Sequence, residues 1–257
     1  MCLILFALHQ HPKYKLVLAA NRDEFFDRPT KSAQFWDDSP EILGGRDVAS
    51  LGTWLATHRN GKFIAITNYR DPKFIDPKAT SRGELSYNYL MKDTSLADFT
   101  KEIREKRHSY NGFNLLLSDD GFNSMYHYSN VSNHPTNIPA GIHGLSNHLL
   151  NTNWPKVEIG KQGLAALMEK EAIKVDDLIS ILQNDQQAAD NLLPGTGISY
   201  ELEKKLSPVF ISMNGYGTRC STAMLLDRQN KLYFHEVTFD ENRRIVSEKN
   251  FKMKINH

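Results

Sequence analysis

The second residue of the chain is a cysteine, and this position gives its thiol more chemistry than an internal cysteine has. Removal of Met1, which is usual when the next residue is small, would leave Cys2 with both a thiol and a free α-amino group. The unperturbed pKa values of these groups, about 8.5 and roughly 7.7–8.0, allow a proton to pass between them near neutrality. An N-terminal residue can therefore act as a nucleophile with its own amine as the base.

A nucleophilic Cys2 needs a cation to favour the thiolate and donors for the developing oxyanion. Arg22 is a candidate cation, and Asn68 and Asn147, each at the end of a short apolar run, are candidate donors. Other interpretations remain open, because free cysteines are often inert buried residues and a cysteine near a terminus can also carry a lipid. Asparagines are also common at strand ends and in turns.

Two polar clusters are candidates for the lining of a pocket around this nucleophile. Asn21-Arg22-Asp23-Glu24 follows a strongly apolar run, so its charges must pair with one another, meet solvent or face a pocket. In the second cluster, Arg46 and Asp47, together with the more distant Arg70, would form a rim that binds a carboxylate, a propionate or a phosphate. A charged turn for the first cluster and a salt-bridge network for the second are the alternatives.

The elements that position these residues are predicted to be mainly antiparallel hairpins. Asn60-Gly61 between two apolar runs is a strong hairpin signal, and Ser81-Arg82-Gly83-Glu84 fits a capping box at a helix start. Because hairpins dominate over strand–helix–strand units, the pattern predicts antiparallel sheets covered by helices. The expected strands are 2–9, 14–20, 53–58, 62–69, 113–118, 122–128, 208–213, 218–226 and 231–238, and the expected helices begin at 81 and span 96–106, 155–170 and 175–184.

The composition is that of an ordinary globular protein and argues against two classes of partner. Of 257 residues, 40% are hydrophobic and 24% charged, and at this length a sheet-rich chain often forms one domain, here 1–257. The net charge of +1 gives no electrostatic case for nucleic acid or an anionic membrane. No apolar stretch approaches the ~18 residues of a membrane span.

The two cysteines, Cys2 and Cys220, are too few for a disulfide framework, although one disulfide remains arithmetically open. A reduced, cytosolic chain is the simpler interpretation. The apolar start lacks the positive flank and the cleavage site of a signal peptide, so we interpret it as a buried strand. The sequence contains no familiar zinc or phosphate-loop motif, and we expect neither a metal nor a required cofactor.

Several motifs together resemble the NRDE family of transport and Golgi organisation proteins. They occur in the family's order along nearly the whole chain: Asn21-Arg22-Asp23-Glu24, Gly44-Gly45-Arg46-Asp47, Gly52-Thr53-Trp54, Thr67-Asn68-Tyr69-Arg70, Ser81-Arg82-Gly83, Gly144-Leu145-Ser146-Asn147 and Tyr216-Gly217-Thr218-Arg219. The resemblance implies a role in intracellular haem trafficking or in lipid and acyl-CoA homeostasis.

A more distant resemblance links the chain to the N-terminal-nucleophile hydrolases of the choloylglycine hydrolase and penicillin V acylase group. It implies an α+β fold, a four-layer αββα sandwich, with Cys2 as the nucleophile and Asp23 as the residue that orients it. It also implies that Asn68 supplies the oxyanion donor and that Asn147 matches a second active-site asparagine. Ala20 stands where the group has a catalytic arginine.

Two arginines are candidates for the catalytic arginines of that group. Arg22 could substitute for the one replaced by Ala20, although we expect strand alternation to turn its side chain to the other face. Arg219 is the candidate for the group's late catalytic arginine.

Two functions of different classes follow from these resemblances. The first is hydrolysis of an amide or thioester by Cys2, with Asn68 and Asn147 at the oxyanion and Asp23 and an arginine holding the nucleophile. The second is a non-catalytic carrier on the same scaffold, with haem or an acyl compound as its cargo. Either function requires a small-molecule substrate or cargo, whose identity the sequence does not give, and the oligomeric state is equally open.

Overall fold

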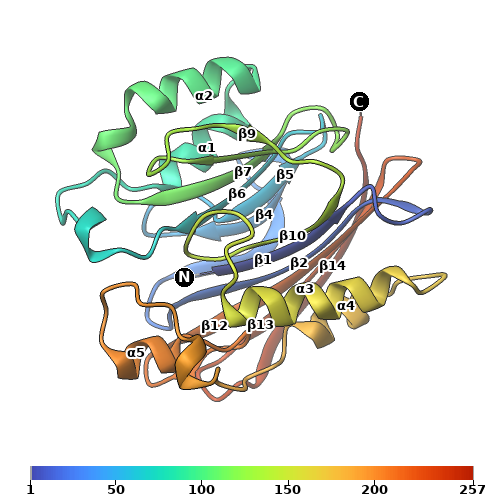
Figure 1. Cartoon of the computed structure of the whole chain (residues 1–257). Helices are drawn as coiled ribbons and strands as arrows, with labels where there is room; N and C mark the ends of the chain where they lie inside the picture. The colour runs from blue at the N-terminus through green and yellow to red at the C-terminus, as the bar shows by residue number, and fades with distance from the viewer. Residues whose placement is uncertain (1, 257) are drawn as a thin grey trace.

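Two antiparallel sheets stacked face to face form the frame of the molecule, which the computed structural model describes from residue 2 to residue 256 (Figure 1). The first sheet has the order β10-β1-β2-β12-β13-β14, with β11 paired to part of β12, and the second runs from β3 to β9 in chain order. The strands of the first sheet are β1 (Cys2–Leu8), β2 (Tyr14–Phe25), β10 (Gly141–Leu145), β11 (Ser212–Met213), β12 (Tyr216–Asp227), β13 (Lys231–Phe239) and β14 (Ile245–Lys254). Those of the second are β3 (Thr30–Trp36), β4 (Ser39–Asp47), β5 (Leu55–His58), β6 (Phe63–Asn68), β7 (Phe113–Ser118), β8 (Tyr126–Ser129) and β9 (Thr136–Asn137).

Helices cover the outer face of each sheet and complete four layers (Figure 1). On the second sheet lie α1 (Gly83–Met91) and α2 (Leu96–Glu105), and on the first lie α3 (Pro155–Met168) and α4 (Val175–Ile181), with the short α5 (Tyr200–Lys205) nearby. The predicted αββα sandwich is therefore confirmed. No helix among residues 2–256 is long and apolar enough to cross a membrane.

Strand β1 is buried along its whole length because both of its faces are covered. Ile4 and Phe6 belong to the core between the two sheets, whereas Leu3 and Leu5 pack against α3. Gly160 allows that helix to approach closely, since a Cβ at this position would lie 2.4 Å from a Leu5 methyl carbon. This packing sets the start of β1, and with it Cys2, at one end of the sandwich.

Strand β2 is longer than expected and carries the first polar cluster inside the sheet. It continues through Asn21-Arg22-Asp23-Glu24 because β12 pairs with it as far as Phe25, so the cluster is not a turn. The predicted capping box at α1 does not form: the Ser81 hydroxyl accepts from the Gly83 N–H at 3.3 Å, but Glu84 instead accepts from the Tyr110 hydroxyl.

Candidate active site

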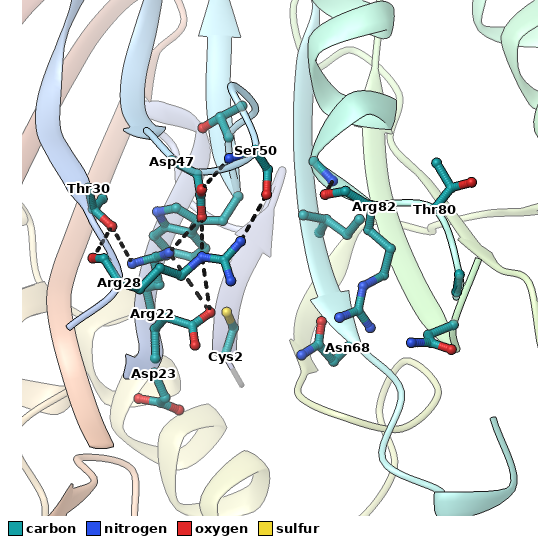
Figure 2. A pocket seen from close by; sticks show the side chains of 18 residues that line it. Cys2, Arg22, Asp23, Arg28, Thr30, Asp47, Ser50, Asn68, Thr80 and Arg82 are labelled. Atoms are coloured by element: carbon teal, nitrogen blue, oxygen red, sulfur yellow. Dashed lines mark hydrogen bonds and ion pairs between the residues drawn. The ribbon is translucent and has the colours of Figure 1, made fainter. Parts of the chain in front are cut away.

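A cleft of about 350 Å³ opens between the two sheets at the end where β1 begins (Figure 2). One wall is formed by residues of β1 and β2, namely Cys2, Arg22, Asp23 and Glu24. The facing wall is formed by Asn68 at the end of β6 and by residues 79–83, which lead into α1. Five residues predicted from the sequence, Cys2, Arg22, Asp23, Asp47 and Asn68, are thus brought together although they come from four different strands.

Cys2 and Arg22 are direct partners in the antiparallel pairing of β1 with β2. Residues opposite each other in such a ladder point to the same face, so the guanidinium of Arg22 shares the inter-sheet face with the thiol. The expectation that Arg22 would turn to the other face is wrong, because residues two apart on a strand, here Ala20 and Arg22, lie on one side of the sheet. Asp23 is the neighbour that turns toward the helical layer.

Cys2 is only 7% exposed, and its thiol is subject to opposing electrostatic effects. Burial raises its pKa, as does the charge of Asp23, whereas the positive charge of Arg22 lowers it. The Cys2 carbonyl accepts a hydrogen bond from the Ser146 hydroxyl at 3.0 Å, which ties the start of β1 to the segment after β10. Met1, whose removal would free the α-amino group, lies outside the described residues.

Asp23 is buried beside Cys2 and is held by the last long hairpin. Its Oδ1 accepts from the Thr218 hydroxyl at 2.8 Å. Burial raises the pKa of Asp23, against the lowering effects of Lys156, Thr218 and Arg70. Lys156 of α3 is itself fully buried, and this burial lowers its pKa to about 8 even though the charge of Asp23 favours the ammonium form. A buried set of charges therefore lies behind Cys2.

Asn68 and Asn147 have different surroundings. Asn68 lines the cleft, whereas Asn147 is fully buried behind it. The amide of Asn147 donates from Nδ2 to the main-chain carbonyl of Asn68 at 3.0 Å, and its Oδ1 accepts from the Ser146 hydroxyl at 3.2 Å. The geometry leaves Asn68 as the asparagine that lines the cleft and makes Asn147 its support.

Two arginines and two carboxylates form a charged network along one wall of the cleft (Figure 2). Asp47 accepts from Arg28 Nε at 2.5 Å and from Arg22 Nη2 at 3.4 Å, and Glu24 lies 3.9 Å from Arg22 and 4.0 Å from Arg28. Burial alone would raise the pKa of Asp47, but the Arg28 and Ser50 hydrogen bonds and the nearby guanidinium charges hold it below its ordinary value. This network stiffens the wall that carries Arg22.

Two predicted pocket or rim residues, Asn21 and Arg46, lie away from this cleft. Asn21 faces the helical layer, where its amide donates to the carbonyls of Leu182 and Val209 at 3.0 and 2.9 Å. Arg46 pairs with an aspartate, Asp38, at 2.5 Å on the outside of the second sheet.

Arg70 and Arg219 also bind parts of the protein itself. Arg70 forms a buried ion pair with Glu203 at 2.8 Å and stacks on Trp154. Arg219 donates to the Phe25 carbonyl at 2.6 Å and also to the Arg28 carbonyl. Neither guanidinium lines the Cys2 cleft.

Sequence reasoning missed two arginines that line the cleft, Arg28 and Arg82. Arg28 follows β2. Arg82 belongs to Ser81-Arg82-Gly83, which the sequence marked as a helix start and as part of the family resemblance but not as part of the site. Each lies in a loop without hydrophobic periodicity, so no local pattern marked its direction. Across residues 2–256, no group of three or more His, Cys, Asp or Glu side chains is arranged to hold a metal ion.

The four-layer sandwich and the cleft at Cys2 define a protein with an N-terminal-nucleophile-hydrolase-like fold. Among solved structures, the chain is similar to the C2A mutant of the conjugated bile acid hydrolase from Clostridium perfringens, with a TM-score of 0.50. The two share 12% sequence identity, and the match covers 100% of this chain and 99% of that one.

The chain belongs to the Transport and Golgi organisation 2 family, whose sequence profile matches residues 1–241. It is 37% identical over 255 residues to the human Transport and Golgi organization protein 2 homolog, covering 92% of each chain. It is 28% identical over 263 residues to the Drosophila melanogaster Transport and Golgi organization protein 2, covering 93% of this chain and 92% of that one.

Proposed function

We propose that this protein hydrolyses an amide or a thioester, with Cys2 as its nucleophile once Met1 has been removed. The observation that carries the proposal is the placement of the Cys2 thiol in a cleft with Arg22 beside it and Asn68 on the facing wall (Figure 2). Arg22 supplies the positive charge that the alanine at position 20 cannot. Asp23, buried next to Cys2, is the candidate for holding the α-amino group in position.

The proposed reaction has two steps. The α-amino group takes the thiol proton, and the sulfur forms a bond to the substrate carbonyl carbon while the carbonyl oxygen gains negative charge. The Asn68 amide donates to that oxygen, a contribution that in other enzymes is about 10²–10³ in rate. The leaving amine or thiol departs with the proton, and water then cleaves the acyl–Cys2 thioester to release the acid.

The test compares Cys2→Ala with a matched variant, Cys220→Ala, since both cysteines are buried and free. Each protein is offered a panel of acyl amides and acyl thioesters, and release of amine or thiol is followed. Intact mass establishes first that Met1 is gone. Turnover that Cys220→Ala retains and Cys2→Ala loses supports the proposal, and a fully active Cys2→Ala protein would refute it.

A non-catalytic carrier of haem or an acyl compound is the second candidate. It is favoured by one observation, that burial raises the pKa of the Cys2 thiol and so disfavours the nucleophilic thiolate. The guanidinium groups in the cleft can bind the propionates of haem and the anionic head group of an acyl compound equally well. A haem titration of the wild-type protein tests this candidate: a saturable Soret shift without turnover supports a carrier, and no shift at micromolar protein argues against haem.

We also propose a reducing, cytoplasmic setting. It is supported by a composition with only two cysteines, which are too few for the disulfide framework of many secreted proteins. Trapping the thiols of the endogenous protein at lysis and weighing the intact chain tests this setting.

A further inference from the structure

Arg82 extends its guanidinium into the cleft from the wall that faces Cys2 (Figure 2). It is the residue that precedes the first turn of α1, and its Nη1 donates to the Gly112 carbonyl at 3.1 Å. Within the described part of the chain, no Asp or Glu oxygen lies within 4.0 Å of this guanidinium. Arg82 therefore brings a positive charge to the cleft that no neighbouring carboxylate offsets by direct pairing.

The other two arginines that line the cleft, Arg22 and Arg28, are already paired with carboxylates. Arg28 and Arg22 share the carboxylate of Asp47, and both lie within 4.0 Å of Glu24. Two guanidinium groups thus face two carboxylates, and their charges largely cancel. An anion that enters the cleft finds these two arginines engaged and meets Arg82 with donor capacity to spare.

The surroundings of Arg82 add to its attraction for an anion. Helix α1 begins at Gly83, so the positive end of its dipole is directed at this wall, which Ser81 and Gly83 also line. Burial lowers the pKa of Arg82, and the distant charge of Glu24 across the cleft acts in the opposite sense. A bound anion would offset the cost of burying this charge.

We propose that Arg82 is an anion-binding subsite, so that the compound bound at Cys2 carries a carboxylate or a phosphate next to the carbonyl group that is attacked. The part of this statement that concerns attack rests on the proposed hydrolase function. The anion subsite itself is a property of the cleft and holds for a carrier as well. Arginine recognises both anions through paired N–H donors, so the shared chemistry is a multi-oxygen anion.

Two alkylating agents of nearly equal size test the subsite without any need for turnover. Iodoacetate carries a carboxylate and iodoacetamide is its neutral counterpart. In each reaction the Cys2 sulfur forms a bond to the CH₂ carbon, the carbon–iodine bond breaks, iodide leaves and the thiol proton goes to solvent. Peptide mass spectrometry follows modification of Cys2 apart from Cys220 and gives the iodoacetate-to-iodoacetamide rate ratio.

Arg82→Gln is expected to lower this ratio at Cys2 by about 5-fold or more, because the charge that steers the carboxylate is lost. Arg82→Lys keeps the charge and should retain most of the ratio. Arg104→Gln, on the exposed side of α2, is the matched control and should leave the ratio unchanged. An Arg82→Gln protein with the wild-type ratio would overturn the subsite whether or not the enzyme hydrolyses anything.

Competition by two different anions shows whether the subsite binds a phosphate or a carboxylate. Protection of Cys2 from iodoacetamide by inorganic phosphate identifies a phosphate subsite, and protection by succinate identifies a carboxylate subsite. If Cys2 resists alkylation altogether, phosphorus-31 line broadening of inorganic phosphate with the Cys2→Ala protein decides instead. Broadening of the phosphate signal, or of the proton signal of succinate, that disappears in Cys2→Ala/Arg82→Gln supports the subsite. No broadening of either signal, or broadening that is the same in both proteins, refutes it.

Discussion

Cys2 of β1 and Arg22 of β2 stand directly opposite each other, with both side chains on the face between the two sheets. The positive charge of Arg22 lowers the pKa of the Cys2 thiol, in opposition to the effect of burial. Arg22→Gln should therefore raise the pKa of Cys2, because the guanidinium charge that favours the thiolate is lost. The pH profile of Cys2 alkylation by iodoacetamide measures the shift, and an unmoved midpoint contradicts it.

The same row of residues continues to Cys220 of β12, which pairs with Arg22 from its other side. Cys2 and Cys220 are thus separated by two strand spacings, about 9–10 Å between Cα atoms. That exceeds the roughly 7 Å limit for a disulfide. Mild oxidation should leave the folded chain without a Cys2–Cys220 bond. Non-reducing peptide mapping checks this, and an intramolecular disulfide formed without unfolding would show that the strand register is wrong.

Asn68 and Asn147 should respond differently to truncation, because one faces the cleft and the other supports it. Asn68→Ala should lower hydrolysis by about 10²-fold or more with little change in stability. Asn147→Ala removes a buried donor to the Asn68 carbonyl and should lower the free energy of unfolding by about 1–3 kcal/mol. Urea unfolding and turnover of both variants give the comparison, and equal effects on both measurements would argue against this division of roles.

Much of the fold followed from local patterns. Hairpin turns such as Asn60-Gly61 and the two apolar runs at the N-terminus predicted the strands that carry Cys2 and Asn68, and both strands formed as expected. Strands β3 and β4 were missed because their alternation is interrupted. The pairing register shifts between Lys31 and Gln34, and Gly44 packs its α-carbon against Ala56, where a Cβ would lie 2.5 Å from the alanine methyl.

The candidate site was predictable only where its residues lie on regular strands. Asn68 ends an apolar run and Asp23 closely follows one, so their place near the ends of strands could be inferred. Arg82 comes from a loop more than fifty residues away from Arg28, and the two meet at one cleft only because the second sheet stacks on the first. Long-range packing also places Arg70 in an ion pair with Glu203, away from the pocket rim where the sequence predicted it.

The Arg70–Glu203 pair should be a strong determinant of stability because both groups are almost fully buried and Arg70 also stacks on Trp154. Glu203→Gln leaves the guanidinium charge without a counter-charge, which should cost about 3–5 kcal/mol. The matched control is Glu158→Gln in the half-exposed pair with Lys161, where the expected cost is below about 1 kcal/mol. Urea denaturation distinguishes the two, and similar costs would count against a buried pair.

Lys156 should make stability rise with pH in the alkaline range. Burial lowers its pKa in the folded chain to about 8 from an ordinary value of 10.5. Between these values the unfolded chain binds a proton that the folded chain does not, so the free energy of unfolding increases with pH. From pH 7.5 to 9.5 this contribution should be about 2 kcal/mol. It should vanish in Lys156→Met, while tyrosines and cysteines that titrate in this window affect both proteins alike. Urea unfolding of both proteins at the two pH values gives the difference, and parallel pH dependences would show that Lys156 keeps its charge in the folded state.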